Sequence, residues 1–190
     1  MAVKSPPAPD PRDLAAGLVR ALVLYSLAEF QSGHATTIRV LAEGTSFSVA
    51  DDGRGHAIER AIGGASYLKF VYTHLDYPFE ASQGAPVQLQ GIGMSLINAL
   101  CSELSVTVRK AEATLRLSFR DGQLDGSELI DVSSKETGNT VAGTISPQLQ
   151  KGCVGTLQLE QWLQGVLAGC PSLNILFNGR ELQAHHHCDA

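Results

Sequence analysis

The periodic pattern of apolar positions begins only after residue 12. Residues 1–12 carry prolines at positions 6, 7, 9 and 11 and predict a disordered arm. Asp13 is a helix-capping residue type, and Gly33 is a typical helix stop. Between them, an apolar face with helical spacing predicts a first helix to about Ser32. The leucines of this face are Leu14, Leu18, Leu22 and Leu27.

Residues 36–53 alternate between apolar and polar and predict a β-hairpin that turns near Glu43 and Gly44. A short helix is expected over residues 57–62. Residues 63–90 have weak periodicity and several turn formers, which indicates a long loop with some local structure.

The remaining pattern predicts a helix opened by two glycines, five strands, a polar connection and a last short helix. In chain order these are residues 91–104 (helix), 105–110 and 113–122 (strands), 123–140 (polar connection), 141–149 and 155–162 (strands), 162–170 (helix) and 173–182 (strand with an Asn-Gly turn). This order predicts an α+β fold, a two-layer sandwich with helices on one face of a mixed, mostly antiparallel sheet. We expect one domain over residues 13–183 and a C-terminal tail over 184–190.

Composition narrows the classes of function. The 190 residues are 44% hydrophobic and 17% charged, with a net charge of -5. Without a basic block the chain is not expected to grip nucleic acid. No uncharged apolar run approaches ~18 residues and no leader is evident, so we expect no membrane span and a cytoplasmic location. The four cysteines match neither a zinc motif nor a disulfide scaffold.

The segment Asp51-Asp52-Gly53-Arg54-Gly55 ends the hairpin and has two interpretations. Asp-Gly alone predicts a tight turn. Alternatively, a carboxylate at a strand end accepts a hydrogen bond from an exocyclic amine, and glycines beside it leave room for a flat ring. A second pair, Gly91 and Gly93, opens a helix about 40 residues later, where free backbone N–H groups favour phosphate. Together the two glycine motifs favour a nucleotide pocket.

These motifs resemble the ATPase domain of the gyrase B and topoisomerase IV group, within the GHKL (Bergerat-fold) ATPases. The similar stretches are SGHATTIRV and FSVADDGRG, then LQGIGMSLINALCSELSVTVRK, and finally WLQGVLAGCPSLNILFNGREL. They extend over roughly residues 14–183. The resemblance implies that Asp51 contacts the adenine amine, with Gly55 under the ring, and that Gly53 belongs to the same nucleotide site. It also implies that Glu29 and Arg54 flank the pocket, where they can form an ion pair.

The resemblance also implies that a threonine supports the same amine through its hydroxyl or a bound water. We place this role on Thr156, with Thr140 and Thr144 as competing positions. His34 and His56, which each flank a glycine near the expected pocket, are interpreted as structural histidines.

The first helix departs from the family pattern. The family carries a glutamate general base and, four residues on, an asparagine that holds Mg²⁺. Ala21 and Tyr25 stand at these positions, so we expect no catalytic residue and no Mg²⁺ site. The phosphate lid departs too, because Pro86, Val87 and Gln88 stand where glycines are expected.

We therefore expect a monomeric GHKL domain that binds ATP or ADP and hydrolyses it slowly or not at all. One alternative is a degenerate GHKL module without nucleotide, which binds a topoisomerase-related protein. Others are a domain that sequesters gyrase inhibitors, and an active topoisomerase-type ATPase if the first-helix register differs. The tail residues His185 to Cys188 are expected to be a disordered terminus, because adjacent residues rarely close a tetrahedral metal site.

Overall fold

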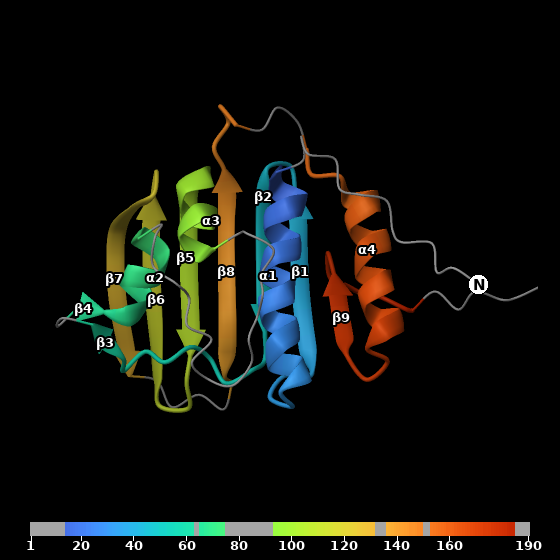
Figure 1. Cartoon of the computed structure of the whole chain (residues 1–190), viewed down its shortest axis with the longest axis horizontal. Coiled ribbons are helices and arrows are strands. Elements are labelled where there is room, and N and C mark those ends of the chain that lie inside the picture. Colours follow the sequence, from blue (N-terminus) through green and yellow to red (C-terminus); the bar gives the residue numbers. More distant parts are fainter. Residues whose placement is uncertain (1–13, 63–64, 75–92, 132–135, 150–152, 185–190) are drawn as a thin grey trace, which may run out of the picture.

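The computed structural model describes residues 14–62, 65–74, 93–131, 136–149 and 153–184. The described part forms two layers, an eight-stranded sheet and helices that cover one of its faces (Figure 1). This confirms the expected α+β sandwich. The expected N-terminal arm, the tail from residue 185, and residues 75–92 with the expected lid lie outside the described residues. The described part of the expected loop over 63–90 has local structure, the short strand Ala65–Ser66 (β4) and the helix Tyr67–Thr73 (α2).

The sheet has the strand order β10-β9-β1-β2-β8-β5-β6-β7. Its strands are β1 (Thr37–Glu43), β2 (Ser46–Asp51), β5 (Cys101–Arg109), β6 (Ala113–Arg120), β7 (Gln123–Asp131), β8 (Gly138–Ile145), β9 (Asn174–Phe177) and β10 (Arg180–Glu181). All neighbouring strands are antiparallel except β1 and β9, which are parallel. The sheet is therefore mixed and mostly antiparallel, as the sequence predicts.

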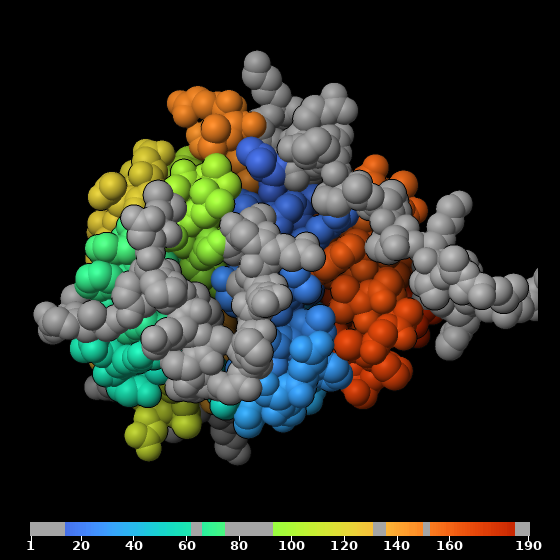
Figure 2. Space-filling view, in the orientation of Figure 1, coloured from blue at the N-terminus to red at the C-terminus, as the bar shows by residue number. Residues whose placement is uncertain are grey.

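The core lies between the sheet and the helices. The helices are α1 (Leu14–Gln31), α2 (Tyr67–Thr73), α3 (Met94–Leu100) and α4 (Thr156–Gly169). In the hairpin, Ile38, Val40, Phe47 and Val49 alternate toward this layer and are at most 3% exposed. Figure 2 shows α1 and α4 side by side on the helical face.

Helix α1 is long and apolar enough, with a mean hydropathy of 1.3, to cross a membrane by length and composition. In the structure its apolar side packs against β1, β2 and β8. Leu18, Val19, Leu22 and Val23 are at most 2% exposed there. Packing as the central helix of a two-layer fold therefore accounts for the composition of α1.

Two expected elements are wrong. Residues 155–162 are not a strand but lie in the first part of α4, because Leu159, Leu163 and Leu167 repeat every four residues and are buried against the sheet. Residues 57–62 contain no helix. There the Arg60 carbonyl accepts from the Tyr67 N–H at 2.9 Å, and Ala61–Ile62 (β3) pairs with Ala65–Ser66 (β4).

Two boundaries also differ. The expected polar connection contains β7, whose polar composition suits an edge strand with a single partner, β6. The expected helix over 91–104 ends at Leu100, and the buried residue Cys101 begins β5 instead of lying within the helix. From this point Leu104, Val106 and Val108 alternate as a strand requires.

Candidate functional site

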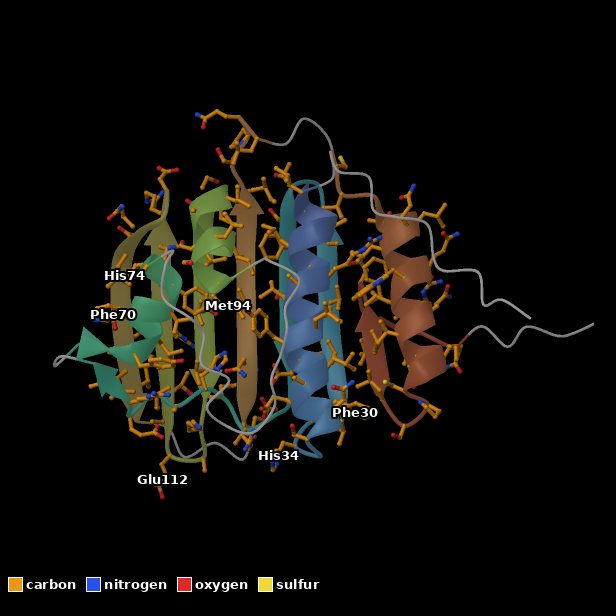
Figure 3. The ribbon with its side chains drawn as sticks, viewed as in Figure 1. Phe30, His34, Phe70, His74, Met94 and Glu112 are labelled. Carbon is orange, nitrogen blue, oxygen red and sulfur yellow. The ribbon has the colours of Figure 1, made fainter. Side chains whose placement is uncertain are left out.

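The end of β2, the start of β8 and the last turn of α1 meet at one end of the sheet, the lower end in Figure 1. Figure 3 shows Phe30, His34 and Glu112 at the same end. Glu112 marks the turn between β5 and β6. Residues 51–55, which the sequence motifs indicated as a candidate site, therefore lie where the end of β2, the start of β8, the last turn of α1 and the β5–β6 turn come together.

Asp51 is the last residue of β2, and it is only 4% exposed. Its Oδ1 atom accepts hydrogen bonds from the backbone N–H groups of Gly53 (3.0 Å) and Asn139 (3.2 Å). Its Oδ2 atom accepts one from the Ser26 hydroxyl of α1 (3.0 Å). An ionised carboxylate has about four acceptor positions, so these three donors leave one for a further donor.

Asp51 and Asn139 interrupt an aliphatic row on the helix-facing side of the sheet. Asp51 pairs with Ile38 of β1, and Asn139 pairs with Val108 of β5. The register of β2 and β8 places Asp51 beside Asn139, since Ala50 pairs with Thr140. Two buried polar side chains thus lie next to each other between apolar neighbours, where unpaired polar atoms are costly.

Asp52 has a different role, although it is adjacent in sequence. Its carboxylate accepts hydrogen bonds from the backbone N–H groups of Thr36 (2.8 Å) and Thr37 (2.9 Å) and from the Thr36 hydroxyl (2.6 Å). Burial alone would raise the pKa of Asp52, but these hydrogen bonds outweigh it and lower the pKa. Asp52 therefore ties the start of β1 to the end of β2.

The glycines around Asp51 are required because backbone and carboxylate oxygens of neighbouring residues lie too close to leave room for a Cβ atom. Gly55 has φ +71°, and a Cβ atom there would lie 2.7 Å from the backbone oxygen of Arg109. A Cβ atom at Gly53 would lie 3.0 Å from Asp51 Oδ1 and 3.2 Å from Glu29 Oε2. Gly138, with φ +122°, allows no Cβ atom at all, since it would lie 2.0 Å from the Asp51 carbonyl oxygen.

The expected ion pair between Glu29 and Arg54 is present. The guanidinium of Arg54 donates to both carboxylate oxygens of Glu29, at 2.8 and 3.1 Å. The hydrogen bond from Arg54 is the largest contribution that lowers the pKa of Glu29, and burial opposes it. This pair fixes the last turns of α1 against the segment that follows Asp51.

Ala21 and Tyr25 lie two and one helical turns before Glu29 on α1. Ala21 is 7% exposed, and Tyr25 packs against the core, where burial raises its pKa to about 12. A methyl group accepts no proton, and a neutral phenol is a poor Mg²⁺ ligand compared with a carboxylate. These α1 residues therefore fit neither a general base nor bound Mg²⁺.

The structure does not bring Thr156 to Asp51. Thr156 is exposed at the start of α4, just after Val154, whose N–H donates to the Gly44 carbonyl at the opposite end of β2. Of the two competing positions, Thr140 pairs with Ala50, and its neighbour Asn139 bonds to Asp51. Sequence reasoning missed Asn139 because a threonine was sought. The signal available was the Gly-Asn pair that opens the strand.

Four candidates remain, and the structure describes three of them, Gly93, His34 and His56. Gly91 lies outside the described residues, and Gly93 precedes α3 with φ -83° and room for a Cβ atom, so the backbone there does not require glycine. His34 is exposed at the end of α1 (Figure 3). The backbone N–H of His56 donates to Asn139 Oδ1 at 2.9 Å, which connects His56 to the Asp51 cluster.

The chain is similar in sequence to known proteins. No protein-family model matches. The DNA topoisomerase IV B protein of Pseudomonas aeruginosa is 27% identical over 177 residues, which are 86% of the chain and 27% of that protein. The DNA gyrase B protein of Haloferax volcanii is 33% identical over 133 residues, 67% of the chain and 21% of that protein. The chain thus spans about a quarter of the length of these curated relatives.

A solved structure shares the fold. The topoisomerase IV ATP-binding domain of Francisella tularensis, solved with a small-molecule inhibitor, matches with a TM-score of 0.73 and 23% identity. The match covers 90% of this chain and 86% of that one.

Proposed function

Because the homologues of this chain are gyrase B and topoisomerase IV B, and its fold is that of the GHKL ATP-binding domain of topoisomerase IV, we propose that it binds an adenine nucleotide, ATP or ADP. The adenine ring is proposed to lie at the Asp51 cluster, which consists of Ser26, Asp51, Gly53 and Asn139. We further propose that hydrolysis of the bound nucleotide is slow or absent.

The observation that carries the binding proposal is the unfilled acceptor position on buried Asp51. Three protein donors hold this carboxylate at 3.0 to 3.2 Å and orient it. A buried carboxylate held by donors on three sides favours a ligand that brings one more N–H group, and the exocyclic amine of adenine is such a group. A Cβ atom at Gly53 would lie 3.0 Å from Asp51 Oδ1, so glycine at this position leaves the carboxylate uncrowded.

The proposal of impaired hydrolysis is supported by the register of α1. Glu29 meets Arg54 as the resemblance implies, and in this register Ala21 and Tyr25 occupy the positions of the base and the Mg²⁺ ligand. General-base catalysis contributes about 10²- to 10⁴-fold in rate. Without a base or a metal from α1, nucleotide turnover should fall by at least that factor relative to an active ATPase of the same fold.

The test is calorimetric titration of the purified chain with ADP and with a non-hydrolysable ATP analogue, with and without Mg²⁺. We expect binding with both nucleotides, and the affinity should change little with Mg²⁺. Strong dependence on Mg²⁺ together with rapid phosphate release would contradict the proposal of impaired hydrolysis. Absence of heat with every nucleotide, from folded protein, would contradict binding and favour the protein-interaction module.

The variant Asp51→Asn tests whether Asp51 contributes to nucleotide binding. The amide keeps the shape of the carboxylate but turns one acceptor oxygen into a donor. The N–H groups of Gly53 and Asn139 exclude the NH₂ group from the Oδ1 branch, so it takes the Oδ2 branch, where the Ser26 hydroxyl can accept from it but the adenine amine cannot. We expect ADP affinity to fall by about tenfold or more, which calorimetry measures. Asp52→Asn serves as the control, because Asp52 faces Thr36 and not the Asp51 cluster. Equal affinity of the Asp51 variant and the unmodified chain would remove Asp51 from the site.

A further inference from the structure

We propose that the free edge of β7 binds an extended segment of a partner protein, in which apolar and basic side chains alternate. The bound segment extends the sheet by one strand through backbone hydrogen bonds. In the strand order, β5 and β6 separate β7 from β8 and the Asp51 cluster (Figure 1). The inference therefore goes beyond the proposed function and does not depend on it.

The length and exposure of β7 carry the first step. This edge strand has nine residues, whereas β10 at the other edge has two. Residues 123–130 are exposed or half-buried throughout. Edge strands are commonly protected by shortness, lysine or proline. β7 contains neither lysine nor proline, and its one bulge lies at Asp125 near the turn, so residues 126–131 form a regular edge.

The direction of the backbone groups follows from the hairpin that precedes β7. The Lys110 N–H donates to the Ala113 carbonyl at 2.8 Å, so the backbone groups of Ala113 point to β5. In an antiparallel ladder successive residues bond to opposite neighbours. The backbone groups of Arg116, three residues later, therefore point to β7, where Arg116 pairs with Glu128.

The residues on either side of Glu128 point the other way. Ser127 and Leu129 direct their N–H and C=O groups away from β6. In the described part of the chain, no hydrogen bond from another element reaches these groups. They are thus available to a further strand.

The helix-facing side of this edge is apolar. Leu129 pairs with Leu115, and Leu124 pairs with Phe119. Leu115 and Phe119 are buried in the helix-facing layer, but Leu129 is 63% exposed and Leu124 is 38% exposed. A further strand with apolar side chains at every second position would cover both leucines.

The other side of the edge and the bulge are acidic. Glu128 and Asp125 have side chains that are 64% and 54% exposed, and the nearest arginine nitrogens lie at 3.9 and 3.8 Å. Ion pairs this exposed are weak, so both carboxylates can attract a further cation. The strand has three acidic residues and no basic one. Like charges on neighbouring strands are unfavourable, so this edge favours a basic strand over a second copy of itself.

The experiment titrates the purified chain with capped, fluorescently labelled peptides of nine residues, and fluorescence anisotropy measures binding. The first peptide alternates valine with lysine, and we expect saturable binding. In the second peptide glutamate replaces lysine, and in the third proline replaces the three central valines. Both should bind at least about tenfold more weakly, because the second loses the charge attraction and the third loses backbone donors.

Two variants of the chain test the same two contributions. Ser127→Pro removes an outward N–H, and proline is tolerated where the N–H of an edge strand faces solvent. Glu128→Lys reverses the charge of the acidic side. Each should weaken binding of the valine–lysine peptide by at least about tenfold. Glu181→Lys is the matched control, because it makes the same charge change at an exposed position on the opposite edge, and it should leave binding unchanged.

Amide hydrogen exchange locates the bound peptide. The N–H groups of Ser127 and Leu129 should exchange at least about tenfold more slowly when the valine–lysine peptide is saturating. The Glu128 N–H points to β6 in both states and serves as the internal reference.

Equal affinity for the valine–lysine and proline peptides would show charge attraction without strand addition and overturn the inference. Absence of saturable binding up to about 1 mM peptide would overturn it too. Dimers of the chain that Ser127→Pro abolishes would assign the edge to a second copy, which also contradicts the proposal. If Ser127→Pro unfolds, the peptide comparison and the exchange measurement on the unmodified chain decide.

Discussion

Asp51 and Asp52 are neighbours in sequence with opposite environments, because successive residues at the end of a strand point to opposite sides. Asp51 enters the core layer, where it keeps one acceptor position unfilled. Asp52 also accepts three hydrogen bonds, but all of them come from Thr36 and Thr37 at the start of β1, so this carboxylate joins two strand ends on the other side of the sheet. The sequence predicts that one of the two carboxylates belongs to the site. Which of them is available to a ligand follows from the side of the sheet that each faces at the end of β2.

The ion pair between Glu29 and Arg54 gives a prediction for single residues. The two side chains are 25% and 36% exposed, so solvent screens them in part, and Glu29→Gln should lower the free energy of unfolding by about 1 kcal/mol near pH 7. The pKa of Glu29 is lowered from 4.5. The stabilisation is therefore present above pH 4.5 and is lost as pH falls through the folded-state pKa.

Urea unfolding at pH 7 and near pH 3 measures this difference. Glu103→Gln is the matched control, since Glu103 pairs with Arg120 in an ion pair whose two side chains are 63% and 61% exposed. It should change the free energy by less than about 0.5 kcal/mol. An equal effect of the two variants would show that the Glu29 pair is no more than a surface contact.

His56 gives a pH prediction. Burial lowers its pKa below 6.5, and the nearby cation Lys110 acts in the same direction, while Asp51 and Glu29 oppose them. The folded state thus favours neutral imidazole, and stability that is full above pH 6.5 should be lost as pH falls through the lowered pKa. We expect unfolding in urea to become easier between pH 7 and pH 5.

His56→Gln should reduce this pH dependence, whereas His34→Gln, at an exposed position, should leave it unchanged. The same pH dependence in both variants would assign the effect to other groups.

At the scale of secondary-structure elements, the close approach of β8 to β2 fixes the geometry around Asp51. The Gly138 backbone lies against the Asp51 carbonyl, where a Cβ atom would meet that oxygen at 2.0 Å with φ +122°. Gly138→Ala should cost about 3 kcal/mol or more and move β8 away from β2. Gly165 lies in α4 with nothing within 4 Å of its Cβ position, so Gly165→Ala should stabilise by about 0.5–1 kcal/mol. Thermal unfolding of both variants should show opposite signs, and equal signs would contradict this account.

Helix α4 provides the second test at this scale. Leu163 is 0% exposed and Leu157 is 64% exposed. Leu163→Ala should destabilise by about 2–5 kcal/mol, because it opens a cavity against the sheet. Leu157→Ala should change stability by less than about 0.5 kcal/mol. In the strand that the sequence predicted over 155–162, Leu157 and Leu159 would share one face, so equal costs of Leu157→Ala and Leu159→Ala would return the segment to that interpretation.

For the whole molecule, the fold could be predicted because its signals are local. The apolar stripe of α1 and the alternation of Val40 and Val49 specify a helix and a hairpin without reference to the rest of the chain. The site could be predicted only in part. The hydrogen bond from Asn139 to Asp51 joins residues 88 positions apart, and it depends on the register of β8 against β2. No local pattern specifies that register, and Thr156 was selected in its place by residue type alone.

The parallel pairing of β1 with β9 has a consequence for synthesis of the chain. Asn178, just after β9, bonds Ala42 of β1 across 136 residues. Until the ribosome has released residues 174–177, β1 keeps one backbone edge unpaired although the rest of its hairpin has formed. Such an edge invites pairing with other chains. A nascent chain that lacks β9 should therefore aggregate or bind chaperones, and one that includes β9 should not.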